Sequence, residues 1–489
     1  MAASPAMKMK WKLILLSCLL LAASGGAWWW QDAGNRLAIA AAALPATPDL
    51  GSTVDVLRTR VAAAESRARR RISVSPGLAE LSRLYHANGF LAEAMQCYAG
   101  LEQMAPAEPR WPHLHATILA GYGETEPAMR LWRLVGELAP AYLPARLRLG
   151  DCLLKANRPD EAAAVYAEVL KISPADSYAL LGLARIDLEA SRWDQARARL
   201  ETVVSQTNYG LGYDLIVGLY ERIGQRERAA AIRGSAKASG AYRDPPDPWL
   251  DGLLDDCFDP YRLSLAAGVA ARIGEPATGI RLLKRAIELT PEDVAGHFQL
   301  GGIYLAQRNL PAAREEFERC TLLAPEFADG WANLSALQAQ AGENAAAART
   351  LLEGLGHCPN SPGLHLMQAR TLREAGRIAP AIAEFQASIR LRPNEPAAYV
   401  ELGNTYISAG QESEGVAQLR HALEADPGDP TALGILTFFA ITTRDEVEAR
   451  RWFARIALQP RMPQPQVARL AEAYRQTFGH DWMPDPPRE

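Results

Sequence analysis

The sequence has few cysteines, little net charge and no recognisable catalytic motif. Its six cysteines form no C-x-x-C pair, which argues against a zinc ribbon, a thioredoxin-like redox site and c-type haem attachment. The formal net charge of −4 gives no strong electrostatic reason to bind nucleic acid. Nucleophile-elbow, zinc-protease, P-loop and dinucleotide-binding motifs do not occur next to a strand pattern. We therefore expect no catalytic residues, no cofactor and no metal site.

A strand pattern is also missing, and a long-period repeat takes its place. Pro325, Pro359, Pro393 and Pro427 follow one another at intervals of 34 residues. Proline cannot continue a helix, so each marks the end of a unit. A fixed period of this length predicts stacked helix pairs.

Each unit carries the same order of residue types. In the unit that starts at His297, Leu300 and Tyr304 lie on one stripe of a first helix at helical spacing, and Ala313 and Phe317 belong to a second helix. A small residue follows the leucine and allows a neighbouring helix to approach closely; in successive units it is Gly301, Ser335, Ala369 and Gly403. Each pair leaves an apolar face that only the next pair can bury.

This order resembles the tetratricopeptide repeat. The resemblance covers nearly all of residues 75–463. It implies an all-α fold, a right-handed superhelical solenoid of about 11 helix-turn-helix repeats with a C-terminal capping helix. It also implies that the chain binds other proteins through its surface.

The N-terminus, residues 1–30, is predicted to be a signal sequence or membrane anchor. Three lysines and no acid precede an uncharged apolar run from Leu13 to Trp30. The preferred interpretation is a single membrane-spanning helix, because the apolar run is long and ends in tryptophans. A cleaved signal peptide and a lipoprotein attached through Cys18 are the alternatives. In each case the body of the protein is exported.

Beyond a spacer and short helix at 31–74, five repeats are predicted at 75–243. Pro291, the next proline in phase after Pro174, lies 117 positions further along the chain; three periods account for 102 positions and leave 15. The candidate insertion is the Pro/Asp-rich loop 244–259. It is interpreted either as a loop that caps the fifth pair, with Trp249 and Leu250 placed on the groove, or as a hinge or partner-docking element between two sub-solenoids.

About six further repeats are predicted at 260–463, followed by a capping helix and tail at 464–489. Cys97, Cys152 and Cys320 fall on predicted helices as buried free thiols. The one conceivable metal-ligand group, His357, Cys358 and His365, spans a repeat boundary, and we do not expect it to bind metal.

The family resemblance implies that the concave surface, lined by first-helix residues beside the packing stripe, binds partners. These residues are Arg83, His86, His113, Arg148, Asp151, Lys155, Tyr178, Arg185, Phe298, Gln340, Met367, Arg370, Arg373 and Asn404. The first part of this set is mainly basic, so an acidic or C-terminal peptide segment is the expected ligand. The lysine and asparagine set of family members that clamp chaperone C-termini is not reproduced.

The sequence therefore predicts a non-catalytic protein–protein interaction scaffold, exported and membrane-anchored, that acts in the assembly of an envelope or secretion-type complex. The expected location is the cell membrane, with a single N-terminal span and the solenoid outside the cytoplasm, periplasmic in a Gram-negative cell. A secreted or periplasmic form after signal cleavage is the alternative. A second hypothesis is an accessory subunit of an enzyme or polysaccharide-export system with a ligand site near 244–259, where the aspartates could bind calcium. A third is carbohydrate binding through exposed tryptophans.

Overall fold

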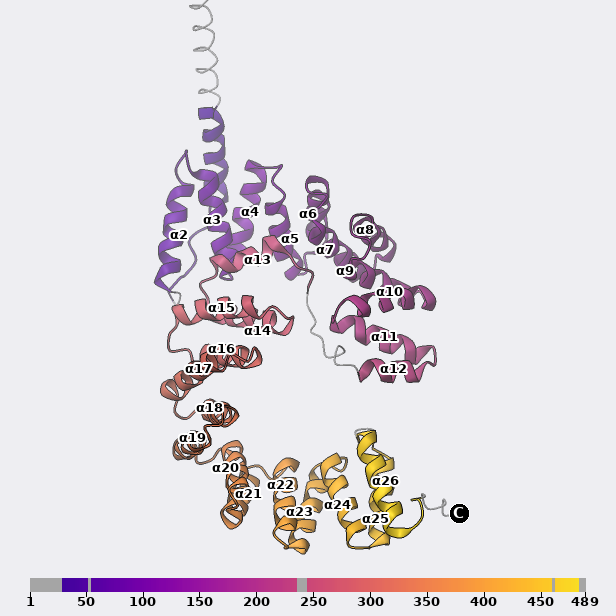
Figure 1. Ribbon diagram of the computed structural model, residues 1–489. Coiled ribbons are helices and arrows are strands. Elements are labelled where there is room, and N and C mark those ends of the chain that lie inside the picture. The colour runs from indigo at the N-terminus through magenta and orange to yellow at the C-terminus, as the bar shows by residue number, and fades with distance from the viewer. Residues whose placement is uncertain (1–28, 52–53, 235–243, 460–461, 483–489) are drawn as a thin grey trace, which may run out of the picture. The chain divides into compact units, whose positions relative to one another are not determined.

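The chain is all-α wherever its structure is described. The computed structural model describes residues 29–51, 54–234, 244–459 and 462–482, and no strand occurs in these ranges. Helices follow one another as antiparallel pairs (Figure 1). The prediction of an all-α repeat fold is confirmed. The chain divides into two compact units, Met1–Pro291 and Glu292–Glu489.

From residue 54 on, the described part of unit 1 contains a short helix before the repeats, five helix pairs, a short irregular stretch and one further pair. Its helices are α2 (Asp55–Ala68), α3 (Val74–Ala87), α4 (Leu91–Met104), α5 (Arg110–Gly121), α6 (Thr125–Leu138), α7 (Leu143–Lys155), α8 (Pro159–Ile172), α9 (Ser177–Glu189), α10 (Trp193–Gln206), α11 (Gly210–Arg222), α12 (Arg226–Arg233), α13 (Pro248–Asp251), the 3₁₀ helix η2 (Gly252–Asp256), α14 (Pro260–Arg272) and α15 (Pro276–Leu289).

Unit 2 contains five helix pairs and a final helix. These are α16 (Val294–Ala306), α17 (Leu310–Leu323), α18 (Ala328–Gln340), α19 (Asn344–His357), α20 (Pro362–Glu374), α21 (Ile378–Leu391), α22 (Pro396–Ser408), α23 (Glu412–Ala425), α24 (Pro430–Thr442), α25 (Glu446–Ala457) and α26 (Gln464–Phe478). Together with the pairs of unit 1, they give the succession of repeats that the proline period predicted.

The stripe residues of the repeats form the core. In the pair α16–α17, Leu300, Ala313 and Phe317 are almost fully buried. A Cβ on Gly301 would lie 2.8 Å from the ring of Phe317, which explains why a small residue follows the leucine. The first helix approaches its partner closely because this position has no side chain.

The turn inside each pair has a second 34-residue period. One residue there adopts a left-handed backbone conformation, with φ between +57° and +88°. Glycine reaches this region without steric cost and holds seven of these turns, whereas Asn157, Ser191, Arg308 and Arg444 hold the other four. The spacing shortens to 33 residues between Ser191 and Gly224, and it is interrupted between Gly224 and Gly274, which are 50 residues apart. This interval contains the insertion that the proline spacing predicted.

The segment before α2, which was expected to be a spacer, begins with a helix. Residues 29–43 are helical. Ala40 and Ala43 are buried, and Ala43 packs directly on Gly100 of α4. The alanine-rich composition of this segment was interpreted as that of a spacer. Small side chains also permit close helix packing, which is what the structure shows here. The greater part of the predicted anchor, residues 1–28, lies outside the described residues. Within the described ranges, no helix is both long and apolar enough to span a membrane.

The final helix α26 closes unit 2. Tyr474 is fully buried and packs edge-to-face on Phe453 of α25, with ring centroids 5.6 Å apart. Its Oη accepts a hydrogen bond from Nε of Arg450 at 3.1 Å. The division into compact units falls at Pro291, not at the insertion. The predicted block boundaries therefore stay a prediction.

Candidate functional site

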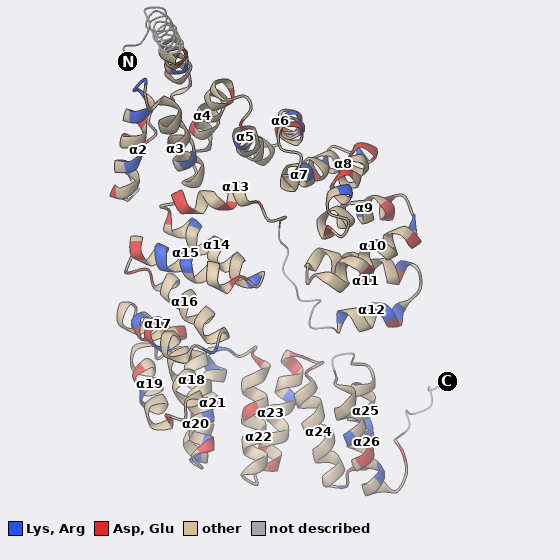
Figure 2. Ribbon diagram, turned by 45° about the horizontal axis from the view of Figure 1, so that its top comes forward, with Lys and Arg blue, Asp and Glu red and all other residues tan. Residues whose placement is uncertain are grey.

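The insertion lies against the first helices of unit 1. Residues 244–259, here called the docked segment, comprise α13, η2 and their flanks. In both views α13 lies on the inner side of the arc formed by α3 to α12 (Figures 1 and 2). Side chains from the α3, α5, α7 and α9 repeats contact it, and these helices are called the first-helix face. Trp249 packs against Tyr142 and His113, which belong to the α7 and α5 repeats and not to the fifth pair that the sequence interpretation named.

Asp247 is the centre of the contact. It is 1% exposed, and His113 of α5 is 0% exposed. Nε2 of His113 lies 2.9 Å from Oδ2 of Asp247. Tyr142 Oη donates to Oδ1 at 2.5 Å, and Nε of Arg148 donates to Oδ2 at 2.9 Å. A buried carboxylate is tolerated only when its oxygens receive such compensation.

These donors determine the charge state of Asp247. Burial by itself raises the pKa of the carboxyl group. Hydrogen bonds from His113 and Tyr142, together with the positive charge of Arg148, outweigh burial and hold this pKa well below its usual range. Asp247 is therefore an anion that the first-helix face specifically stabilises.

Trp249 makes the aromatic part of the contact. Its ring stacks on that of Tyr142, with centroids 3.5 Å apart and planes 11° from parallel. It also meets the ring of His113 edge-on at 5.5 Å. The backbone N–H of Trp249 donates to Tyr142 Oη at 3.2 Å. One tyrosine thus contacts both the carboxylate and the aromatic ring two residues later.

The other end of the docked segment is held at α3. Nε of Arg83 donates to Asp256 Oδ2 at 2.9 Å. The side-chain amide of Asn88 donates to the carbonyl of Asp256 at 2.9 Å and accepts from the N–H of Phe258 at 2.6 Å. Because this amide pairs with backbone groups, it holds the end of η2 independently of the side chains at these positions.

Asp255 of the docked segment contacts a different helix. Oδ1 of Asp255 lies 2.9 Å from Nη1 of Arg281 on α15. Figure 2 shows the acidic colour of this stretch beside the basic colour of α15. Both side chains are mainly exposed. Asp255 therefore differs from Asp247 and Asp256, which point into the contact.

The remaining predicted residues of unit 1 lie in different environments. Oη of Tyr178 donates to the carbonyl of Asp244 at 3.2 Å. Arg185 lies 3.7 Å from Asp151, and Lys155 is exposed. His86 differs from expectation because it is buried, with Nδ1 3.1 Å from Oη of Tyr98. Helix packing turns this position toward the core instead of the face.

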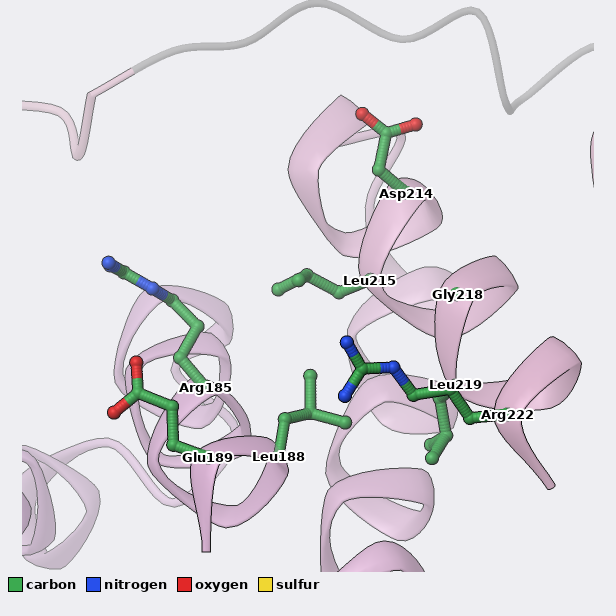
Figure 3. Close-up of a pocket in the computed structure, with 8 residues that line it drawn as sticks. All are labelled: Arg185, Leu188, Glu189, Asp214, Leu215, Gly218, Leu219 and Arg222. Carbon is green, nitrogen blue, oxygen red and sulfur yellow. The ribbon is translucent and has the colours of Figure 1, made fainter. Parts of the chain in front are cut away.

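A pocket of about 290 Å³ lies between α9 and α11. The guanidinium of Arg222 projects into it toward Leu188 (Figure 3). Its lining combines apolar and charged side chains: Arg185, Leu188, Glu189, Asp214, Leu215, Gly218, Leu219 and Arg222.

The predicted residues of unit 2 divide into a charged group and single side chains. Glu401 of α22 pairs with Arg370 and Arg373 of α20, at 2.9 Å and 2.7 Å. Phe298 is half-buried against Phe327. Met367 is half-buried, whereas Gln340 and Asn404 are exposed. Binding of a partner by any of these residues stays a prediction.

The second hypothesis placed a ligand site near residues 244–259, with their aspartates as possible calcium ligands. In the structure, two of these aspartates contact cationic or imidazole side chains. Asp247 and Asp256 are engaged by imidazole and guanidinium groups, which compete with any cation. Within the described residues, no group of three or more His, Cys, Asp and Glu side chains could hold a metal ion. The aspartates were treated as possible calcium ligands, although their charge complements the basic first-helix face.

Sequence reasoning found Arg83, His113, Arg148 and Tyr178 but not Asn88 or Tyr142. These two lie just outside helix ends, at the C-terminal cap of α3 and before the first residue of α7. A survey of polar residues in the turns of the repeats would have included both.

Comparisons with known proteins find similarity in the repeat region. Two tetratricopeptide-repeat family models match the chain, over residues 153–208, 372–437 and 265–321. A search of curated proteins finds no match.

Several solved structures are similar at low identity. MamA from Desulfovibrio magneticus RS-1 is 15% identical, with 35% of this chain and 96% of that chain covered and a TM-score of 0.30. A thermophilic TPR protein from Thermus thermophilus is 21% identical over 35% and 94%, with a TM-score of 0.29. Yeast Tom70 is 13% identical over 84% and 97%, with a TM-score of 0.39. Likeness at this level does not indicate a ligand.

Proposed function

This chain is a tetratricopeptide-repeat protein, and we propose that it is a non-catalytic scaffold that binds segments of partner proteins along the first helices of its repeats. One observation supports this most directly. The first-helix face of unit 1 holds the chain's own docked segment through side-chain charges, an aromatic stack and backbone hydrogen bonds. These are the interactions by which a protein binds a peptide.

In unit 2, we propose that the corresponding surface of α20 and α22 binds the partner. Helices that pack on α20 and α22 belong to the same or flanking repeats. Arg370 and Arg373 share the single carboxylate of Glu401, which leaves a local excess of positive charge. Met367 adds a half-buried apolar side chain beside them. This combination favours a partner segment that carries a carboxylate next to an apolar residue.

We further propose that the scaffold is exported and held at the membrane by residues 1–30, where it contributes to assembly of an envelope or secretion-type complex. The basic flank, the apolar run and the tryptophans support this location. Protease added to intact spheroplasts should digest the repeats. Digestion only after the cells are lysed would place the repeats in the cytoplasm and contradict export.

Capture of partners from solubilised membranes tests the binding surface. The double variant Arg370→Ala/Arg373→Ala should lose a partner that the wild-type chain retains. Arg319→Ala/Arg349→Ala removes the same charge from exposed positions on the second helices α17 and α19, and should retain that partner. Equal capture by all three proteins would exclude the α20–α22 surface.

A further inference from the structure

The docked segment contacts unit 1 in the manner of a ligand. His113 and Asp247 are 134 residues apart in the sequence, and Arg83 and Asp256 are 173 apart. The contacts alternate between carboxylate, aromatic ring and backbone, with Asp247, Trp249 and Asp256 facing α5, α7 and α3. A covalently attached segment benefits from a high effective concentration, so modest contacts are sufficient to keep it bound.

We propose that residues 244–259 are an intramolecular ligand that occupies a peptide-binding site of unit 1, and that a partner segment of the same chemistry binds there by displacing it. This inference rests on the proposed function, because it requires that partner segments bind the first helices. The partner segment carries a carboxylate, an aromatic ring two residues later, and a second carboxylate about nine residues after the first.

Each element of this specificity comes from a separate part of the site. The first carboxylate meets Arg148, Tyr142 and the imidazole of His113, all partly or fully buried. A lone anion on a surface does not gain this much, because solvent screens exposed pairs. The aromatic ring replaces Trp249 against Tyr142, and the side-chain amide of Asn88 pairs with backbone groups, so it does not select the side chains there. An acidic segment without an aromatic residue would lose the stacking contact.

The segment also carries its own chemical reporter. Cys257 is a free thiol with 0% exposure, positioned between Asp256 and Phe258. When the segment leaves, this thiol becomes accessible to N-ethylmaleimide. Cys97 and Cys320 are buried in helix pairs and report whether the repeats remain folded.

The experiment uses the full-length chain, a variant with an emptied site and a matched control. Asp247→Asn/Trp249→Ala removes the buried carboxylate charge and the stacked ring. Asp255→Asn makes the same charge change at a mainly exposed position of the segment. The probe is a fluorescein-labelled peptide of residues 244–259 that carries Cys257→Ser.

We expect the double variant to alkylate at Cys257 about tenfold faster than wild type or more, with Cys97 and Cys320 still protected. It should bind the labelled peptide at least about tenfold more tightly than wild type, because its own segment no longer competes. Asp255→Asn should behave as wild type in both assays. Adding Arg148→Ala to the double variant should abolish peptide binding.

Three results would overturn the proposal. These are protection of Cys257 in the double variant, equal peptide affinity of wild type and double variant, and peptide binding that survives Arg148→Ala. If Cys97 and Cys320 also become reactive, the single variant Trp249→Ala decides the question by the same criteria. Failure here leaves the result at Arg370 and Arg373 unchanged, so the two proposals are tested separately.

Discussion

A buried carboxylate holds the insertion in place. Asp247 exchanges its hydration for hydrogen bonds from His113, Tyr142 and Arg148. Such a group stabilises the fold only when all of these partners are present, because a buried charge without a partner is costly. The same residue also begins α13, since its Oδ1 accepts from the N–H of Leu250 at 3.3 Å.

Asp247→Asn should therefore destabilise unit 1 by roughly 3 kcal/mol, because the substitution removes the buried anionic partner of Arg148 and leaves this guanidinium only the mainly exposed Asp244 at 3.9 Å. Urea unfolding followed by circular dichroism measures the difference. Asp255→Asn, at a mainly exposed position, should change stability by less than about 0.5 kcal/mol. Equal stability of the two variants would show that Asp247 does not hold the segment.

His86 gives unit 1 a second dependence on a buried polar residue. Burial, with smaller contributions from the charges of Arg262 and His113, lowers the pKa of His86 to about 4. The unfolded chain takes up this proton at higher pH, so the folded state is fully stabilised above about pH 6.5 and loses stability as the pH falls toward about 4.

Wild-type unit 1 should lose about 2 kcal/mol of stability at this site between about pH 7 and about pH 5. The variant His86→Gln cannot take up the proton and should show a correspondingly smaller loss. Urea midpoints of both proteins at the two pH values give the comparison. Parallel pH profiles would mean that His86 does not titrate in this range.

At the scale of the helix, close approach depends on glycine at particular positions. A Cβ on Gly150 of α7 would lie 2.5 Å from the ring of Tyr166, whose Oη donates to Asp151 at 2.7 Å. Gly218 of α11 has no neighbouring atom within 4 Å of such a Cβ. Both glycines lie inside first helices, but only one is required by packing.

Gly150→Ala should cost about 1 to 3 kcal/mol through overpacking against Tyr166. Gly218→Ala should instead stabilise its helix by about 0.5 to 1 kcal/mol, because alanine has the higher helix propensity. Thermal melting of the two variants provides the test. A change of the same sign in both would contradict the role assigned to close packing.

The helices were predictable because their signals are local. Leu300, Gly301 and Phe317 lie within one repeat, and the 34-residue period places each helix pair without knowledge of its neighbours. The helix at 29–43 was missed because alanine-rich sequence is typical of both spacers and tight packing. Ala43 is buried by Gly100, which lies 57 residues later, and no local pattern records that contact.

At the scale of the whole molecule, the sequence predicted both partners of the contact but did not predict that they bind each other. The basic first-helix residues and the acidic insertion were both identified, and an acidic ligand was expected. The sequence does not state that residues 244–259 are that ligand, because their contacts cross up to 173 residues and depend on how the repeats stack. Only the three-dimensional arrangement joins Asp247 to His113.

Each repeat of such a protein contacts mainly the repeats next to it, so a compact unit of several repeats contains most of the contacts that stabilise it. We therefore expect each of the two compact units to fold by itself. Residues 292–489, expressed alone, should retain helical circular dichroism and a cooperative thermal transition. Tyr474 of the closing helix α26 is fully buried, so a substitution at this position tests whether α26 packs in the fragment as it does in the full chain. Tyr474→Ala should lower the melting temperature of the fragment, at a cost of about 3 kcal/mol or more. An unfolded wild-type fragment would show that unit 2 depends on unit 1.

Hydrogen–deuterium exchange across residues 247–258 tests most directly whether the chain occupies its own first-helix face. The amides of Trp249, Leu250, Asp251 and Phe258 all donate hydrogen bonds within the docked arrangement. In the wild-type chain they should exchange slowly, and in Asp247→Asn/Trp249→Ala they should exchange as an unfolded peptide does, while α16 to α26 remain unchanged. Exchange of these amides at the unfolded rate in the wild-type chain would contradict the account.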